Sequence, residues 1–319
     1  MAKKEGKKIN DLIFHELIKR GYSQEGKTRI WNIADSKLWY LTPEQAQAYL
    51  DVLDSESYKS EFGPKEMTLI GTNISMIVET AAKEPINLVD IGCGDGRKAK
   101  IFVEEISKKT KMRYCPIDIS GYMVAKAIKE ISKYNAGEII ESKWNISDFE
   151  NLENITPLLN QKEYKKNLFL LLGNTLGNFE LHDLLYQIRN CMKSGDYLLI
   201  GNGIENKNME EVIEFCKTNK LNNEFLIKIP LQLGLEREDV EFGVRFANHR
   251  IEFYYTIKKE KSITFNKKTI EFKKGDQLLI AVTYHYSKKD FVEFLNLYFD
   301  EVTTKISEDE SYALALCKK

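Results

Sequence analysis

The segment 87–96, with the sequence NLVDIGCGDG, constrains the fold of this chain more than any other. A short apolar run breaks into closely spaced glycines, and a helical pattern follows over residues 97–106. Glycine is needed where the backbone turns with a positive φ and approaches a ligand closely, because a Cβ atom would obstruct both. The segment therefore predicts a strand, a tight turn and a helix, with a nucleotide-like ligand held at the turn.

The spacing of the glycines separates one kind of nucleotide from another. A dinucleotide-binding turn reads G-x-G-x-x-G, and its third glycine packs the helix on the strand. Here the pattern is D-x-G-x-G-x-G, with Asp90 ahead of Gly92 and Gly94, and Arg97 stands at the third dinucleotide position. A carboxylate near the ligand opposes a pyrophosphate and suits a cationic ligand with an amino-acid tail, which favours S-adenosylmethionine. The pattern is that of a class I methyltransferase; the alternative is an ordinary strand, turn and helix without a ligand.

Two later segments fit the same ligand. Residues 113–120 (RYCPIDIS) predict a second strand that ends in Asp118, roughly twenty residues after the glycines, where a carboxylate chelates both hydroxyls of a ribose. Residues 144–149 (WNISDF) bring Asp148 as an acceptor for the adenine amino group and Phe149 as an aromatic face beside the base. Taken alone, Asp148 is equally suited to be a helix N-cap.

Composition agrees with a globular enzyme. The chain has 319 residues, of which 43% are hydrophobic. This length and composition allow a large buried core, so one large domain or two domains are expected. Lysines and arginines number 47 and acids 48, so no global charge favours nucleic acid as a partner. The five cysteines form no C-x-x-C pair, and we expect them to be reduced, with neither a metal site nor a disulfide framework. No signal-type or transmembrane run is visible, so no membrane partner and a cytoplasmic location are expected.

The expected elements change character along the chain. Helices are predicted over residues 9–20, 43–53 and 63–82. Strands then alternate with helical stretches, which predicts a doubly wound parallel sheet with helices on both faces. These strands span residues 87–91, 114–118, 138–144, 168–172 and 197–201. Residues 249–286 read as an antiparallel meander, before a helix at 288–298 and strands at 301–306 and 311–317.

The return to an α/β pattern at the end predicts a β-rich insertion between the fifth and sixth strands. We expect an α/β fold of the class I methyltransferase type, with a Rossmann-like sheet and a second α+β domain. The cofactor-binding domain would comprise residues 68–205 plus 286–319. The substrate-binding domain would comprise residues 1–67 plus 206–285, made of the N-terminal helices and the insertion.

The predicted fourth strand ends in LLGNTLGNF, residues 171–179, and this segment indicates a chemistry. The carboxyl ends of strands carry the site in a doubly wound sheet. Gly173 and Gly177 permit a tight loop, while Asn174 and Asn178 present carbonyl acceptors that hold a substrate amine without a counter-charge. The amine must stay neutral because only its lone pair can attack the sulfonium methyl. The alternative is that the asparagines are turn residues with positive φ.

In this order and spacing, D-I-G-C-G-D-G, P-I-D-I-S, S-D-F and G-N-T-L-G-N-F resemble the histidine-specific methyltransferase family. That family includes the ergothioneine-pathway enzyme that trimethylates the α-amine of histidine, and fungal enzymes that N-methylate dimethylallyltryptophan. The resemblance covers most of the chain and implies S-adenosylmethionine as the cofactor. Together with the spacing argument, it leads us to expect these cofactor-binding residues: Asp90, Gly92, Gly94, Asp118, Asp148, Phe149 and Gly173.

The resemblance also implies which residues contact the substrate. Asn178 would hold the amine and Tyr40 would contact the substrate, so these two are the expected catalytic residues. An aromatic residue in an interdomain core is the alternative for Tyr40. The remaining expected substrate-binding residues are Asn174, Phe253, Thr283, His285 and Tyr286. His285 is interpreted as a proton acceptor or polar anchor, with a residue at the rim as the alternative.

One departure from the family limits the choice of substrate. The histidine enzymes grip the imidazole ring with a Glu and a Ser two residues apart, and this chain has Ala281 and Thr283 there. Losing one charge-assisted hydrogen bond to a buried group costs about 1.5 to 3 kcal/mol, or roughly tenfold to a hundredfold in recognition. Free histidine in the usual pose is therefore not expected, and a more apolar or aromatic amine suits Phe253, Ala281 and Tyr286.

The expected function is S-adenosylmethionine-dependent N-methylation of an amino acid or related small amine. Catalysis would consist mainly of alignment, with nucleophile, methyl carbon and sulfur in line within about 3 to 3.5 Å, and no metal is needed. Two alternatives remain at this point. The changed substrate strand suggests a non-catalytic cofactor-binding partner or sensor, and a protein terminus or side chain could replace the small amine.

Overall fold

The computed structural model describes residues 9–61, 63–134, 137–147, 149–159 and 161–319, which fall into two compact units. Unit 1 comprises the described residues up to Val52 together with Lys207–Thr283. Unit 2 comprises Leu53–Asn206 and Tyr284–Lys319. Residues 53–67 thus group with unit 2, whereas the sequence-based division placed them in the substrate-binding domain. The assignment of cofactor and substrate roles to these units stays a prediction.

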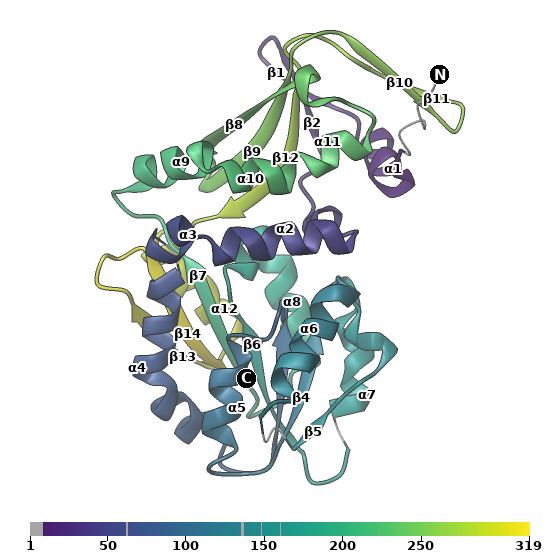
Figure 1. The fold of residues 1–319 in the computed structure, drawn as a ribbon. Helices are drawn as coiled ribbons and strands as arrows, with labels where there is room; N and C mark the ends of the chain where they lie inside the picture. The colour runs from purple at the N-terminus through teal and green to yellow at the C-terminus, as the bar shows by residue number, and fades with distance from the viewer. Residues whose placement is uncertain (1–8, 62, 135–136, 148, 160) are drawn as a thin grey trace. The chain divides into compact units, whose positions relative to one another are not determined.

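Unit 2 is built on a seven-stranded sheet with the order β13-β14-β7-β6-β3-β4-β5 (Figure 1). Its strands are β3 (Ile86–Ile91), β4 (Met112–Ile117), β5 (Glu138–Ile139), β6 (Lys166–Leu171), β7 (Tyr197–Gly203), β13 (Glu301–Ile306) and β14 (Tyr312–Lys318). Strands β3 to β7 pair in parallel, and β14 pairs antiparallel with both β7 and β13. Because β3 lies between β4 and β6, the strand order reverses at β3, and the carboxyl ends there form a topological switch point.

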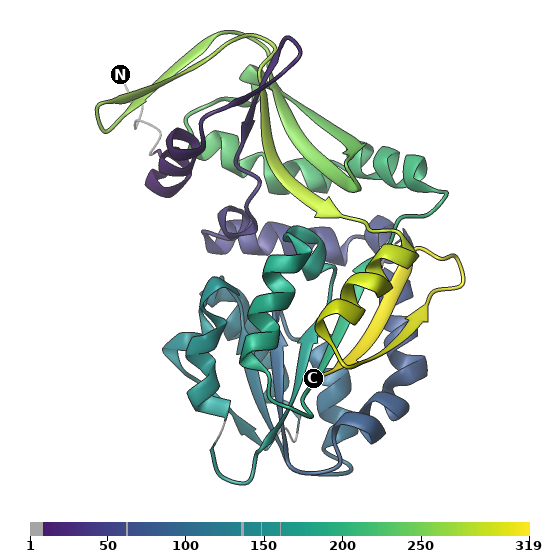
Figure 2. The same ribbon diagram turned by 180° about the vertical axis from the view of Figure 1, so that it is seen from behind.

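Helices cover both faces of this sheet, and strand side chains alternate between two apolar cores. Leu88 of β3 belongs to the core shared with α4 (Gly63–Ala81), α5 (Ala99–Ile106) and α6 (Gly121–Ile131). Val89, the next residue, belongs to the core shared with the helices of the opposite face, which Figure 2 shows towards the viewer. Those helices are α7 (Thr156–Leu159), α8 (Leu181–Cys191) and α12 (Lys288–Tyr298).

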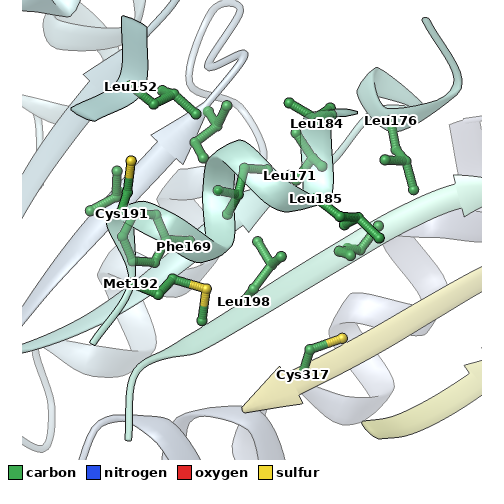
Figure 3. Packing of buried hydrophobic residues seen from close by; sticks show 14 of the residues in the cluster. Leu152, Phe169, Leu171, Leu176, Leu184, Leu185, Cys191, Met192, Leu198 and Cys317 are labelled. Atoms are coloured by element: carbon green, nitrogen blue, oxygen red, sulfur yellow. The ribbon is translucent and has the colours of Figure 1, made fainter. Parts of the chain in front are cut away.

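Helix α8 shows why these elements pack as they do. Its buried residues Leu181, Leu184, Leu185 and Ile188 recur at helical spacing and form one apolar stripe. Figure 3 shows Leu184 and Leu185 of this stripe together with Phe169 and other side chains of the strands. The strands beneath are buried on both faces, which is why they read as continuous apolar runs in the sequence.

Unit 1 contains a five-stranded sheet with the order β1-β2-β12-β9-β8 and a separate two-stranded sheet, β10-β11 (Figure 1). The strands are β1 (Ser23–Glu25), β2 (Thr28–Asn32), β8 (Val240–Ala247), β9 (Arg250–Ile257), β10 (Lys261–Phe265), β11 (Lys268–Phe272) and β12 (Gln277–Tyr284). The helices are α1 (Asp11–Arg20), α2 (Pro43–Asp54), α9 (Met209–Thr218), α10 (Lys220–Leu226) and α11 (Lys228–Gln232), and α3 (Glu56–Glu61) follows α2 within unit 2.

The α/β fold class, with a doubly wound Rossmann-like sheet and a second β-rich part inserted before its sixth strand, is confirmed. Single elements depart from expectation in three places. No strand was expected between the predicted helices 9–20 and 43–53, but β1 and β2 form there, because β2 pairs in parallel with the distant β12. The predicted meander was incomplete, because it omitted β8, which pairs with β9. The hairpin β10-β11 was expected to belong to the meander but forms its own sheet.

The third departure is at residues 138–144, where the expectation of a strand was wrong. Only Glu138–Ile139 is strand, and a 3-10 turn follows over Lys143–Asn145. The carboxamide of Asn145 turns the chain here, because its nitrogen donates to the Pro116 carbonyl at 2.6 Å and its oxygen accepts from the backbone of Ser142. This side-chain bonding replaces a longer ladder of backbone hydrogen bonds.

No helix in the described part of the chain is long and apolar enough to cross a membrane.

Candidate functional site

The glycine turn lies between β3 and α5, at the switch point of the unit 2 sheet. Gly92 and Gly94 have φ values of 71° and 52°, and the N–H of Gly92 donates to the Ile117 carbonyl at 2.8 Å. A Cβ atom added to Gly94 would meet no described atom within 4 Å, so the backbone there is open to a ligand. The turn is therefore fastened to the end of β4 on one side and accessible on the other.

Asp118 lies next to this turn. Its Oδ2 accepts the Gly94 N–H at 3.1 Å, and its Oδ1 accepts the Ser120 N–H at 2.9 Å. Burial raises the pKa of Asp118 to about 6, although these N–H groups act in the opposite direction. Each carboxylate oxygen has a second lone pair, so Asp118 can still accept from the hydroxyls of a diol.

Asp90 is buried beneath the turn and is less accessible than its sequence position suggested. The Tyr114 hydroxyl donates to its Oδ2 at 2.8 Å. Burial raises the pKa of Asp90 to about 7, so its carboxyl is partly protonated at neutral pH. Tyr114 was not singled out from sequence, although aligning the two strands pairs it with Leu88, on the same face as Asp90.

Phe149 and the loop after β6 converge on Gly92. A Cβ atom at Gly92 would lie 3.1 Å from Oγ1 of Thr175 and 3.6 Å from Cζ of Phe149. The Phe149 ring is half-buried, with its centroid 5.0 Å from that of Phe179. Asp148, the predicted acceptor for adenine, lies outside the described residues. The aromatic ring and the loop thus both lie close to the glycine turn.

Ile146 is a residue of this site that sequence analysis did not single out. It forms an isolated parallel bridge with Asp118, and its side chain is 54% exposed. A large, exposed apolar side chain next to Asp118, which is predicted to bind the cofactor, is suited to cover the flat face of a base. Its signal in the sequence was its place in WNISDF, two residues before Asp148.

The loop 173–178 is fastened to the end of β7 by two asparagines. Asn174 adopts a left-handed conformation with φ 63°, and its Oδ1 accepts the Gly203 N–H at 2.6 Å. In return, Oδ1 of the buried Asn202 accepts the Gly177 N–H at 2.9 Å. Asn174 thus has the turn role that was the alternative to substrate binding. Asn202 was missed, although the Gly-Asn-Gly at the end of the fifth strand was a signal for it.

Asn178 differs from Asn174 in both respects. Its φ is not positive, so the turn interpretation does not apply to it. Its side chain is half-buried and makes no hydrogen bond to any other described residue. A carboxamide with unused donors and acceptors, in the loop that follows the carboxyl end of the central strand β6, is available for a ligand.

Glu66 and Lys98 form a charged pair beside Gly173 that sequence analysis missed. Oε1 of the buried Glu66 accepts the Gly173 N–H at 2.7 Å, and Oε2 lies 2.6 Å from Nζ of Lys98. Gly173 has φ 75°, and a Cβ atom there would lie 2.6 Å from the same Nζ. The position of Lys98 just after the glycine turn was a usable signal for it, but Glu66 is distant in sequence and had none.

His285 is buried, so its interpretation as a rim residue is wrong. A Cβ atom at Gly203 would lie 2.7 Å from its Cε1 and 3.1 Å from its Nδ1. Nδ1 has no hydrogen-bond partner among the described residues. Burial lowers the pKa of His285 to about 4, so the ring is neutral at neutral pH.

Tyr286 lies next to His285 in the chain and stacks on Tyr284. Their ring centroids are 5.7 Å apart and their planes differ by 5°. The Tyr284 hydroxyl donates to Oε1 of Glu180 at 2.9 Å, and burial raises the pKa of Tyr286. The two tyrosines thus form a stacked aromatic pair in unit 2, which is hydrogen-bonded to Glu180 through Tyr284.

Three of the predicted substrate residues belong to unit 1. The Tyr40 ring packs 5.4 Å from Tyr49 and 5.9 Å from Phe225, in an aromatic cluster within this unit. Phe253 is stacked on Phe242 at 6.4 Å and packs against the cluster that includes α9. Thr283 is half-buried near the end of β12. The other predicted substrate residues, Asn174, Asn178, His285 and Tyr286, belong to unit 2.

A carboxylate does occur near Ala281, on the neighbouring strand β9. Strands β9 and β12 are adjacent, and the Ile257 N–H donates to the Asp276 carbonyl at 2.8 Å, so the end of β9 meets the start of β12. Antiparallel counting from this contact brings Glu252 near Ala281. Glu252 is buried and bonded to both Arg245 and Arg250. Its oxygens are therefore already held by two guanidinium groups.

In the described parts of both units, no group of three or more His, Cys, Asp or Glu side chains could hold a metal ion. The five cysteines are buried and form no disulfide with one another.

Residues 60–319 match a sequence model whose description is histidine-specific methyltransferase, SAM-dependent. No curated protein sequence matches the chain. Among solved structures, the chain resembles an S-adenosylmethionine-dependent methyltransferase from Clostridium acetobutylicum ATCC 824, with 11% identity, 85% of this chain and 98% of that chain covered, and a TM-score of 0.44. It also resembles the PH0226 protein from Pyrococcus horikoshii OT3, with 14% identity, coverage of 86% and 99%, and a TM-score of 0.46.

Proposed function

The chain belongs to the histidine-specific, S-adenosylmethionine-dependent methyltransferase family, and we propose that it methylates the nitrogen of an amino acid or a related small amine. The enzyme is a methyltransferase and its cofactor is S-adenosylmethionine; the amine is the proposed part. The observation that carries the proposal is the contact between the loop 173–178 and the glycine turn. A Cβ atom at Gly92 would come within 3.1 Å of Thr175 in that loop.

The residues of unit 2 fit this cofactor. The open backbone at Gly94 and the spare lone pairs of Asp118 suit the ribose, and Ile146 and Phe149 suit the two sides of the base. Lys98, the cation beside Gly173, would hold the carboxylate of the amino-acid tail. Bound S-adenosylmethionine supplies an electrophilic methyl group on a sulfonium sulfur.

Asn178 is the residue that we assign to the amine. Its carboxamide oxygen would accept an N–H from the substrate without offering a negative charge, so the amine keeps a free lone pair. The loop that carries Asn178 is held by Asn174 and Asn202, which limits its movement. Alignment of this kind accounts for a large part of catalysis in a reaction with two bound partners.

His285 would contribute a hydrogen-bond acceptor rather than a base. Because its pKa is lowered to about 4, it cannot take a proton from an ammonium group at a useful rate. The proton of the substrate ammonium would leave to water before attack. A neutral imidazole with an unused Nδ1 is suited to orient a polar group of the substrate.

The substrate side chain is proposed to be apolar or aromatic. Ala281 offers no acceptor, and the nearby Glu252 is already bonded to two arginines. The stacked pair Tyr284 and Tyr286 offers an aromatic surface in unit 2, and Phe253 offers one in unit 1. Tyr40 and Thr283 stay as proposed substrate contacts.

Methyl-labelled S-adenosylmethionine tests this function. The purified enzyme would be incubated with either the small-molecule or the macromolecular fraction of a cell extract, and the label followed by mass spectrometry. Label in a small amine supports the proposal and identifies the substrate. Label in protein alone contradicts it and changes the substrate class, and label in the oxygen or carbon of a small molecule contradicts the assignment to nitrogen.

A further inference from the structure

The carboxylate of Glu66 joins three segments that are far apart in the sequence. It projects from α4, accepts the backbone N–H of Gly173 after β6, and forms an ion pair with Lys98 at the start of α5. Its side chain is only 6% exposed and that of Lys98 is 27% exposed. A buried charge costs stability unless it is paired and hydrogen-bonded, and Glu66 meets both requirements.

Two glycines make room for this arrangement. A Cβ atom at Gly173 would lie 2.6 Å from Nζ of Lys98, and one at Gly201 on β7 would lie 2.4 Å from Oε1 of Glu66. Each contact is with the flexible end of a side chain, so a larger residue at Gly173 or Gly201 would require Lys98 or Glu66 to shift. The two glycines therefore leave room for the ion pair in its observed place beside the ends of β6 and β7.

Lys98 keeps donors for a ligand while it is bonded to Glu66. An ammonium group has three N–H donors, and Glu66 uses one of them at the 2.6 Å contact. A lysine side chain without a fixed partner loses much rotational freedom when a ligand binds, and this loss of entropy lowers the affinity for the ligand. Holding Nζ in advance removes part of that cost.

We propose that Glu66 is a positioning residue that holds Lys98 in place for the amino-acid tail of the cofactor and fixes the first residue of the loop 173–178. The proposal rests on the assignment of Lys98 made under the proposed function. It does not depend on which amine is methylated. Glu66, on α4, would thus fix both Lys98, which holds the cofactor tail, and the loop that carries Asn178.

Two ligands that differ only in the tail test the proposal by isothermal titration calorimetry. S-adenosylhomocysteine has the amino-acid tail, whereas 5′-methylthioadenosine lacks it. We expect Glu66→Gln to weaken S-adenosylhomocysteine about tenfold, as loss of one charge-assisted contact implies, and to leave 5′-methylthioadenosine unchanged. Glu79→Gln is the matched control, since Glu79 lies on the same helix and pairs at 3.2 Å with Lys109 at the surface; it should change neither affinity.

A general folding defect would weaken both ligands together, so the difference between them isolates the tail. Hydrogen exchange supplies a second readout, because Glu66→Ala should expose the Gly173 amide, whereas Glu66→Gln keeps an acceptor for it. An unchanged ratio of the two affinities in Glu66→Gln, or stronger binding of S-adenosylhomocysteine, would overturn the proposal. Neither measurement uses an amine substrate, so failure here is distinct from failure of the proposed N-methylation.

Discussion

Asn174 and Asn178 share a loop and a residue type, but their surroundings differ. The oxygen of Asn174 is bonded to Gly203, and its backbone takes the left-handed conformation that asparagine tolerates. The side chain of Asn178 bonds to no other described residue. We therefore propose the chemical role for Asn178 and the structural role for Asn174.

Replacement of Asn178 by alanine should lower turnover on the order of tenfold to a hundredfold, because the amine loses its acceptor and its alignment. The affinity for S-adenosylhomocysteine should stay the same, since Asn178 is assigned to the substrate alone. Asn190→Ala, at an exposed position of α8, is the control for a neutral asparagine loss. Undiminished turnover in Asn178→Ala would remove this residue from the mechanism.

The raised pKa of Asp118 leads to a prediction of how cofactor affinity depends on pH. Its pKa is raised to about 6, and a protonated carboxyl is a poorer acceptor for two ribose hydroxyls. The affinity for S-adenosylhomocysteine should therefore be constant above pH 7 and fall by up to about tenfold per unit below pH 6.

Two variants separate Asp118 from the nearby Asp90 in calorimetric titrations over this pH range. Asp118→Asn should bind weakly and without the step near pH 6, whereas Asp90→Asn should keep that step. A step that survives in Asp118→Asn belongs to another group.

At the scale of elements, the site depends on how closely the glycine turn approaches α6. Gly96 has φ 79°, and a Cβ atom there would lie 3.0 Å from the Cα of Ala127. The contact is with helix backbone, so a side chain cannot be accommodated by a rotamer change. The turn and the helix must separate or the backbone must distort.

Gly96→Ala should therefore lower the free energy of unfolding by about 1 to 3 kcal/mol, through strain at positive φ and crowding against α6. Gly71→Ala is the control, because Gly71 lies within α4, has no positive φ and has open space around its Cα. That change should stabilise the protein by up to about 1 kcal/mol. Urea denaturation measures both, and equal effects in the two variants would argue against the close approach.

For the stability of the protein as a whole, we expect His285 to contribute to a loss of stability in mild acid. Its folded pKa of about 4 lies below its ordinary value of 6.5, so the folded protein favours the neutral ring. This stability is fully present above pH 6.5 and is lost as the pH falls towards 4. Asp90 and Asp118, with raised pKa values, bind protons in the folded state and act in the opposite direction over the same range.

The variant His285→Gln isolates the pH-dependent contribution of His285 to the free energy of unfolding. The free energy of unfolding of the wild type, relative to that of the variant, should fall between pH 6.5 and pH 4.5 as measured by urea denaturation. Glu205 is the charged group that favours the protonated ring, but burial outweighs it. A difference between the two proteins that does not change with pH would show that the ring is not held neutral.

Much of unit 2 could be predicted from the sequence, and less of unit 1. The central strands are buried on both faces, so each reads as a continuous apolar run bounded by turn residues. In unit 1, β2 is short and half polar, and it forms because it pairs with β12, which lies more than two hundred residues later. Local pattern contains no information about such a partner.

Local backbone preferences and spacing are enough to predict the strand, glycine turn and helix of residues 86–106, the acid at position 118 and the two-asparagine loop. The order of these motifs along the chain also indicates the family. Only the folded chain shows that Glu66 contacts both Lys98 and Gly173, that Asn202 braces the loop, and that His285 is buried and neutral. Those roles arise from contacts between distant segments, and burial then sets the charge of each group.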